Sequence, residues 1–279
     1  MALVFLVVYL SSLGITEVQA GVAVSAYGVG GLIAAPLTGY ACDRLGSLTV
    51  MKIVLFAQGF ILLVIPFATN LKYVLCLILF WSLTGEAFRP ASSAFIASLS
   101  DGKWRGFAFA LNRIATNVGM AIGPAVGGVL IQAKPASIFF LNGVASIVSA
   151  GFLSYFSRGT CFERVPGAHR DVRALKASQL ILFSIALIPA FCAFYQYRST
   201  MAQYLLERRI LEPYFLGLLL SINAVLVLIL QIPLALYLQK GHARISMVVG
   251  AFLVGTGFGA FIFTTNFWGA ALCVIVWTL

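Results

Sequence analysis

The sequence predicts an all-α protein that crosses a membrane several times. Its 279 residues are 61% hydrophobic and only 9% charged, whereas a typical soluble domain has about 25% charged residues. Because this small number of charges cannot cover a water-facing surface, most of the surface must face lipid. The apolar residues come in continuous runs of 19 residues or more, long enough for a helix to cross the membrane. A membrane β-barrel would instead show short segments of alternating polarity.

Charged residues mark the ends of these apolar runs and divide the chain into eight expected spans. We expect them at 18–42, 53–70, 72–99, 106–132, 136–157, 178–205, 213–238 and 245–264. Apolar stubs at 1–12 and 267–279 are expected to form one partial helix at each end. The first stub has no basic stretch before it, which favours a cut-short transmembrane helix over a signal peptide. A turn is expected at Thr264-Thr265-Asn266, because the run from 245 to 279 is too long for one crossing.

The distribution of lysine and arginine predicts the orientation. If the segment 43–52 is cytoplasmic, eleven of the 18 basic residues lie on that side, four lie on the other side and three lie inside helices. This is the positive-inside bias of inserted membrane proteins. The long basic loop then divides the protein, and we expect an N-terminal bundle at 1–157, a cytoplasmic linker at 158–177 and a second bundle at 178–279.

Several classes of function are excluded by composition. The net charge of +10 is spread over short loops instead of one face with interleaved aromatics, so nucleic acid is not expected as a partner. The five cysteines form no CxxC pair and the two histidines form no HExxH motif, so we expect neither a metal nor a cofactor. No clustered nucleophile or catalytic pair is visible, and the expected function is not enzymatic.

A short turn after the first full span has the pattern GxxxDRxG. Its residues are Gly39, Asp43, Arg44 and Gly46. The glycines let helix ends approach closely. Asp43, at the membrane face, can accept hydrogen bonds from a basic partner or a helix N-terminus. Two interpretations are open: Asp43 latches the cytoplasmic side closed, or these charges belong to a solvated turn that only fixes topology.

The span at 106–132 has the pattern NxGxxxGPxxGG. Its residues are Asn117, Gly119, Gly123, Pro124, Gly127 and Gly128. Glycine at every fourth position permits close backbone packing, and proline removes a helical hydrogen bond. Ordinary small-residue packing explains the bare glycine spacing. With Pro124 and Gly128 added, we favour a bend that moves between inward- and outward-facing states.

Three ionisable side chains lie inside the spans of the first bundle, namely Glu86, Arg89 and Arg113. A charge at the bilayer centre costs at least ~2.5–3.5 kcal/mol, so such a group usually faces a cavity or a partner. Two interpretations are open for Glu86. It forms a structural ion pair with Arg89 at i,i+3 spacing, or it has a proton- or substrate-binding role.

The second bundle contributes further candidates for a cavity lining. They are Gln196 and Arg198 in the span at 178–205, and Gln231 in the next span. Amide and aromatic side chains suit a broad amphiphilic substrate. The alternative is an aromatic belt at the outer membrane interface.

Together these motifs resemble those of the major facilitator superfamily, and of its bacterial drug/proton antiporter branch in particular. GxxxDRxG resembles the family motif between helices 2 and 3, and NxGxxxGPxxGG resembles the antiporter motif of helix 5. The resemblance implies a fold of twelve helices in two bundles. This chain would hold the end of helix 1, helices 2 to 9 and the start of helix 10, and so would be truncated at both ends. Ser47 and Leu48 depart from the family pattern, which has basic residues there.

The resemblance also implies a function. A member of this branch is expected to be a monomeric secondary transporter of the inner (plasma) membrane that exports small amphiphilic molecules by proton-coupled alternating access. Its expected partners are the lipid bilayer, a small-molecule substrate and protons. A proton-coupled nutrient symporter of the same fold is the alternative, followed by a non-transporting receptor or a membrane-embedded enzyme.

Overall fold

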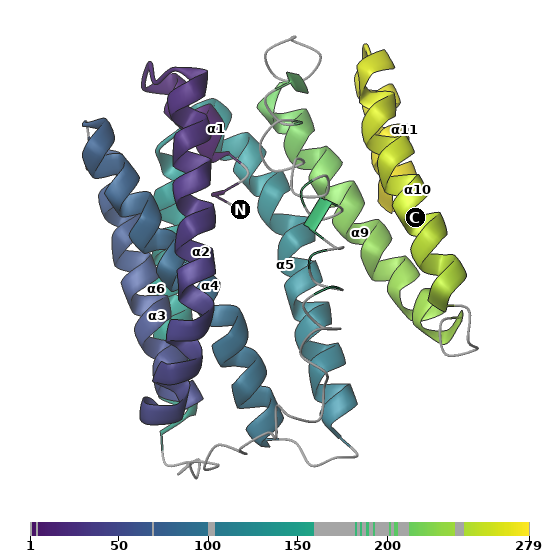
Figure 1. Cartoon of the computed structure of the whole chain (residues 1–279). Coiled ribbons are helices and arrows are strands. Elements are labelled where there is room, and N and C mark those ends of the chain that lie inside the picture. The colour runs from purple at the N-terminus through teal and green to yellow at the C-terminus, as the bar shows by residue number, and fades with distance from the viewer. Residues whose placement is uncertain are drawn as a thin grey trace.

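The described part of the chain consists mainly of long helices (Figure 1). The computed structural model describes residues 2–3, 5–68, 70–99, 104–158, 212–237 and 243–278, with the positions 182, 185, 188–189, 192, 201 and 204–205. The helices in these residues are α1 (Leu6–Ser12), α2 (Glu17–Leu45), α3 (Ser47–Val64), α4 (Leu71–Leu99), α5 (Arg105–Ala133), α6 (Ser137–Phe156), α9 (Pro213–Tyr237), α10 (Ala243–Ala260) and α11 (Phe267–Thr278). The 3-10 turns η1 (Ile65–Phe67) and η5 (Phe261–Phe263) follow α3 and α10.

Six helices of the described residues, α2 to α6 and α9, are long and apolar enough to cross a membrane. They correspond to six of the eight expected spans. The expected span at 178–205 lies largely outside the described residues. The one expected at 245–264 is α10 with η5, whose apolar part, Val248–Phe263, is shorter than the other six. The structure therefore shows a polytopic helical protein but not the full count of eight.

The largest difference in boundaries is at α3, which begins at Ser47 and not at residue 53. A charged residue, Lys52, ends the apolar run there without ending the helix. A lysine stem lies easily along an apolar surface while its ammonium group reaches water. Both terminal stubs are helical, as α1 and α11. The break expected at 264–266 is confirmed: the Asn266 side chain accepts a hydrogen bond from the Gly269 amide (2.8 Å) at the start of α11.

Both ends of α2 have a local cause in the sequence. Thr16 and Gln19 form a capping box, in which each side chain accepts a hydrogen bond from the backbone amide of the other. At the other end, Gly46 has a φ of 84°, a left-handed conformation that costs glycine little. Because α3 starts at the next residue, α2 and α3 are joined by this single glycine.

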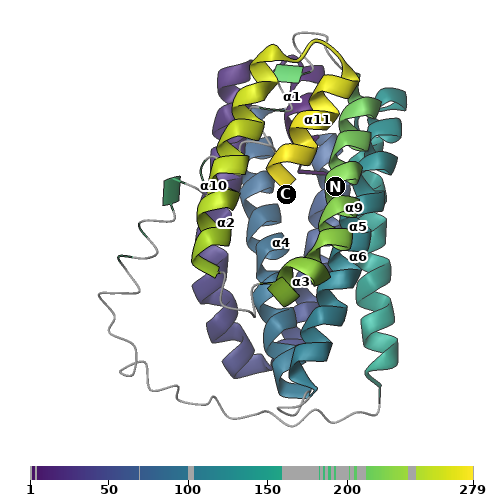
Figure 2. The same ribbon diagram turned by 90° about the vertical axis from the view of Figure 1, so that its right-hand side faces the viewer.

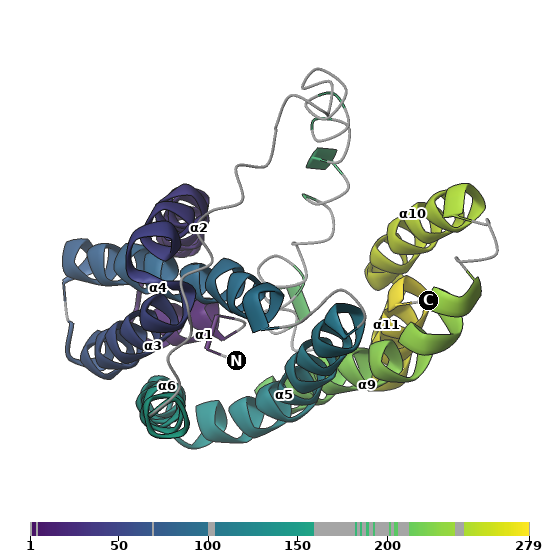
Figure 3. The same cartoon turned by 90° about the horizontal axis from the view of Figure 1, so that it is seen from below.

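The helices run side by side along one direction (Figures 1 and 2). Viewed along that direction, α2, α3, α4 and α6 form one group and α10 and α11 form another (Figure 3). The groups meet where α5 packs along α9. The largest buried cluster includes Phe5, Leu10, Ile65 and Phe139 around α1, and it continues to Leu219 of α9 and Val274 of α11.

Close approach of α3 and α6 depends on a pair of glycines. A Cβ atom at Gly59 would lie 2.6 Å from Ile147 Cγ1, and one at Gly143 would lie 2.8 Å from Leu63 Cγ and 2.9 Å from the Gly59 carbonyl oxygen. Lipid tails are as apolar as the side chains, so helices in a membrane associate through such close packing and not through the hydrophobic effect. We infer that the two glycines set the α3–α6 distance.

Replacing Gly143 by alanine should therefore destabilise the bundle. We expect Gly143→Ala to lower the free energy of unfolding by about 1–3 kcal/mol, the usual result of overpacking. Gly151, on the same helix, has no neighbour within 4 Å of its ideal Cβ position. Gly151→Ala should be neutral, or stabilising by up to about 1 kcal/mol from helix propensity. Thermal unfolding in detergent compares the two variants, and an equal effect of both would exclude this role for Gly143.

Candidate functional site

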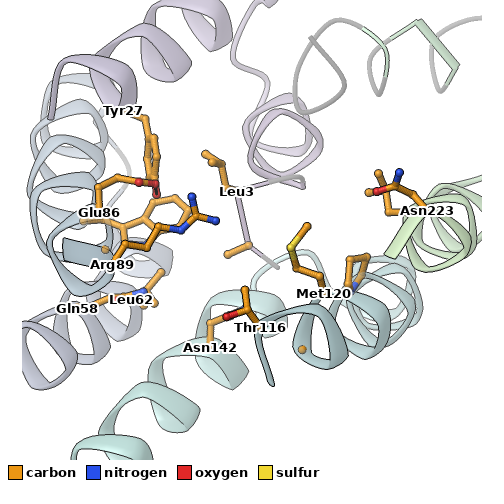
Figure 4. Close-up of a pocket in the computed structure, with 16 residues that line it drawn as sticks. Leu3, Tyr27, Gln58, Leu62, Glu86, Arg89, Thr116, Met120, Asn142 and Asn223 are labelled. Carbon is orange, nitrogen blue, oxygen red and sulfur yellow. Dashed lines mark hydrogen bonds between the residues drawn. The ribbon is translucent and has the colours of Figure 1, made fainter. Parts of the chain in front are cut away.

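Glu86 lies in the middle of α4 and is held by Tyr27 of α2 (Figure 4). The Tyr27 hydroxyl donates a hydrogen bond to Glu86 Oε1 (3.1 Å). Tyr27 is itself fixed, because the Ser82 hydroxyl donates to its backbone carbonyl and its ring makes an edge contact with Trp81 (centroids 5.1 Å apart). Gly31 leaves room for the carboxyl side chain, since a Cβ atom there would lie 3.2 Å from Glu86 Cγ. The carboxyl group is thus positioned by contacts between α2 and α4.

A cavity of about 310 Å³ opens beside this pair. Glu86 and Arg89 both line it, together with polar side chains from α3, α5, α6 and α9. In this cavity Glu86 makes no salt bridge with Arg89 among the described residues, and its hydrogen-bond partner is Tyr27. The geometry therefore does not support the structural ion pair that the i,i+3 spacing allows.

A second cavity, of about 680 Å³, adjoins the first. Arg89 and Arg113 line it, with Asn112 and several serine and threonine hydroxyls. The two cavities share Gln58, Gly85, Arg89 and Thr116. Three of the charged residues singled out in the sequence are thus brought to one connected polar region, with Arg89 at the border between its two parts.

Some lining residues were not among the sequence candidates, namely Tyr27, Gln58 and Asn142 of the smaller cavity. Asn223 of α9, which the sequence offers beside Gln231 as an amide of the same span, also lines this cavity, and its amide donates to the Thr278 hydroxyl (2.7 Å). A single uncharged polar residue in the middle of an apolar span is the signal they share. The signal is weak, because such a residue can also bond its own helix backbone, as the Asn142 amide does with the Ile138 carbonyl (2.8 Å).

The helix 5 motif lies partly at the contact between α5 and α9. A Cβ atom at Gly217 of α9 would lie 2.3 Å from the Pro124 carbonyl oxygen and 3.3 Å from Gly128 Cα, so the two backbones touch. Farther along, the Asn117 amide donates to the side-chain oxygen of Gln231 (2.9 Å). Gln231, a candidate for the cavity lining, is thus found at the helix contact.

The other glycines of the motif are placed differently. Gly119 lines the smaller cavity, and a Cβ atom there would meet nothing within 4 Å. Gly127 is buried and Gly123 is half-buried. Close backbone contact is therefore found at Pro124 and Gly128 and not at Gly119.

The turn with the GxxxDRxG pattern is exposed. The Arg44 guanidinium lies over the Tyr40 ring, 4.6 Å from its centroid. Asp43 is exposed and has no salt bridge within the described part of the chain. A Cβ atom at Gly39 would meet nothing within 4 Å, whereas Gly46 supplies the left-handed turn. Within these residues the geometry is that of a solvated turn, and a partner for a latch is not among them.

The remaining candidates are Gln196 and Arg198, which lie outside the described residues. Within the described ranges, no group of three or more histidine, cysteine, aspartate or glutamate residues could hold a metal ion.

Membrane-crossing helices that enclose charged and amide side chains define a polytopic membrane transport protein. The chain belongs to the Major Facilitator Superfamily, whose profile matches residues 1–279. It is therefore a multi-pass secondary transporter and not an enzyme, and the family implies the two-bundle fold.

Three relatives are similar to this chain over different shares of its length. The chain is 25% identical to the uncharacterized MFS-type transporter YqjV of Bacillus subtilis, covering 100% of this chain and 70% of that protein. It is 23% identical to a Na⁺, Li⁺, K⁺/H⁺ antiporter of Planococcus maritimus, covering 86% of this chain and 65% of the relative. It is 22% identical to the quinolone resistance protein NorA of Staphylococcus aureus, covering 51% and 37%. The chain thus spans two thirds or so of the first two relatives and less of the third.

The hydrogen bond between Asn117 and Gln231 should couple α5 to α9. We expect a double-mutant cycle of Asn117→Ala and Gln231→Ala to give a coupling energy of about 0.5–1.5 kcal/mol, the range for buried amide bonds in membrane bundles. Asn223, also on α9, has Thr278 as its partner, so the cycle of Asn117→Ala with Asn223→Ala is the control. Unfolding of the three single and two double variants, with the unchanged protein, in mixed detergent measures both cycles. Equal coupling in the two would show that the bond does not join the helices.

Proposed function

We propose that this chain acts in proton-coupled export of small amphiphilic molecules by alternating access. The two bundles are those at 1–157 and 178–279, with the segment 158–177 as a cytoplasmic linker. The observation that carries the proposal is a carboxyl group at mid-span, Glu86, held by a phenol beside a cavity. An ionisable group at this depth is costly to bury and marks a site where protons or substrates pass.

Tyr27 suits Glu86 to proton exchange. A phenol hydroxyl is both a donor and an acceptor. It donates to the carboxylate, as observed (3.1 Å), and it can accept from the neutral acid after protonation. The contact therefore survives in both protonation states, so a proton can bind and leave without loss of the α2–α4 packing.

The contact between α5 and α9 supports alternating access. At Gly217 and Pro124 the two helices meet through backbone atoms, so few side chains must rearrange when one bundle rocks against the other. The bend at Pro124 expected from the sequence belongs to the same proposal. Two relatives are named for cation/proton antiport and for quinolone resistance, and both functions agree with a proton-coupled exporter.

A proton-coupled nutrient symporter would use the same acid in the same kind of cavity. The direction of substrate movement under an imposed pH gradient distinguishes the two. In an exporter, substrate moves against the proton flow, whereas in a symporter it moves with it. The helix 5 motif, through its resemblance to the antiporter motif, favours export.

Glu86→Gln keeps the shape of the side chain and its hydrogen bond but cannot ionise. In the product of the complete gene, reconstituted in liposomes, we expect this change to reduce pH-driven transport to the level of protein-free liposomes. Substrate binding should survive, because the cavity keeps its shape. Glu17→Gln, at the exposed start of α2, is the matched control and should transport normally. If pH-driven transport persisted in Glu86→Gln, Glu86 would be only a structural partner of Tyr27.

Gly217→Ala tests the α5–α9 contact. Its new methyl group would need the space of the Pro124 carbonyl oxygen, so the helices must separate locally. We expect a roughly tenfold slower transport rate, equivalent to about 1.4 kcal/mol in the barrier. Gly255→Ala on α10, where a Cβ atom meets nothing within 4 Å, should leave the rate unchanged. Equal rates for the two variants, measured in the same liposomes, would assign the contact to passive packing.

A further inference from the structure

The two cavities carry an excess of positive charge. Arg89 lines both of them and Arg113 lines the larger one, whereas Glu86 is the only acidic side chain among the described lining residues. Guanidinium groups stay protonated in proteins. The described lining of the cavities therefore holds two permanent cations and at most one anion.

Both arginines lie well inside helices that are long and apolar enough to cross a membrane. Arg89 is about 15 Å from the end of α4, and Arg113 is about 12 Å from the start of α5, at 1.5 Å per residue. Charges at such depth need compensation. Neither guanidinium has a salt bridge within the described ranges, and the Glu86 carboxyl is engaged by Tyr27. Two charges are thus placed in a polar cavity without a described counter-ion.

The rest of the lining divides into a polar part and an apolar part. Around the arginines, the larger cavity offers uncharged hydrogen-bonding groups, namely Gln58, Ser92, Ser93, Asn112, Thr116 and Ser146. The smaller cavity adds apolar surface from Leu62, Trp81, Met120 and Leu220. Such a division suits a molecule with a charged head and an apolar body.

We propose that the substrate is an amphiphilic anion, whose carboxylate or sulfonate group binds between Arg89 and Arg113. Its apolar body lies against Trp81 and Met120. A guanidinium binds a carboxylate through two parallel hydrogen bonds, which gives both affinity and orientation. The same positive field disfavours free alkali cations. The inference rests on the proposed export function and specifies its substrate class.

Three probes that differ only in the head group test the charge preference. They are naphthaleneacetate, naphthaleneethanol and naphthaleneethylamine, titrated calorimetrically into the complete gene product in lipid nanodiscs. We expect the acetate to bind most tightly and the amine least. Arg113→Gln should weaken acetate binding roughly tenfold, the effect of losing one charge-assisted contact, and leave ethanol binding unchanged. Arg113→Lys should restore part of the loss because the charge returns.

Lys52→Gln is the matched control. Lys52 lines a separate groove of about 510 Å³ between α3 and α6, so its loss removes one positive charge from the protein without touching the two cavities. Acetate binding should not change in this variant.

Equal affinity for the acetate and the ethanol, or tighter binding of the amine, would overturn the proposed substrate class. So would an equal loss of affinity for acetate and ethanol in Arg113→Gln, since Arg113 would then only shape the cavity. These outcomes leave pH-driven transport as a separate measurement. If naphthaleneacetate binds selectively but no pH gradient drives its transport, the export proposal fails and the assignment of an anion-binding site stands.

Discussion

Close backbone approach at single glycines is the constraint on which this helical arrangement depends. The hydrophobic effect that holds soluble helices together is absent between helices in lipid, so packing has to replace it. Gly30 places α2 against α4, where a Cβ atom would lie 2.7 Å from Ser82 Cβ. Gly143 and Gly217 do the same for α3–α6 and α5–α9, and Gly257 does so for α10 and α11, where a Cβ atom would lie 2.6 Å from Trp277 Cβ. Each of these four helix pairs thus has at least one glycine whose replacement by a larger residue would push the helices apart.

The polar site is a consequence of this pairing. The glycine contact of α2 with α4 aligns the two helices, so that Tyr27 faces Glu86 and the Ser82 hydroxyl reaches the Tyr27 carbonyl. The pairs α2–α4 and α5–α9 do not fill the space between them, and the smaller cavity lies there. The larger cavity adjoins it and is lined by residues of α3, α4, α5 and α6. Charged groups that would be costly in lipid are tolerated because they face this space.

The sequence predicted well those features that follow from the free energy of transferring side chains into lipid, namely the spans and the charged residues inside them. Continuous apolar runs predicted α2, α4, α5 and α6 closely, and the turn at 264–266 was correct. The same physics identified Glu86, Arg89 and Arg113 as residues that face a cavity. Predictions failed or stayed incomplete for features that depend on which helices pack against each other. Tyr27 could not be recognised as the partner of Glu86, because the sequence does not say that α2 packs against α4, and Arg89 was the only local candidate. The sequence also does not say which face of α5 packs against α9. It therefore could not distinguish Gly119, which lines the cavity, from Gly128, which lies at the α9 contact.

The single-residue connection at Gly46 has a mechanical consequence. Because a single residue joins the two helices, the connection cannot extend, and any tilt of α2 at that end must displace the start of α3. The glycine contact of α3 with α6 passes the displacement on, and α4 is joined to α2 through Gly30. The four helices α2, α3, α4 and α6 are therefore mechanically coupled. A change in protonation at Glu86 that tilts α2 or α4 would move all four helices together as one rigid body.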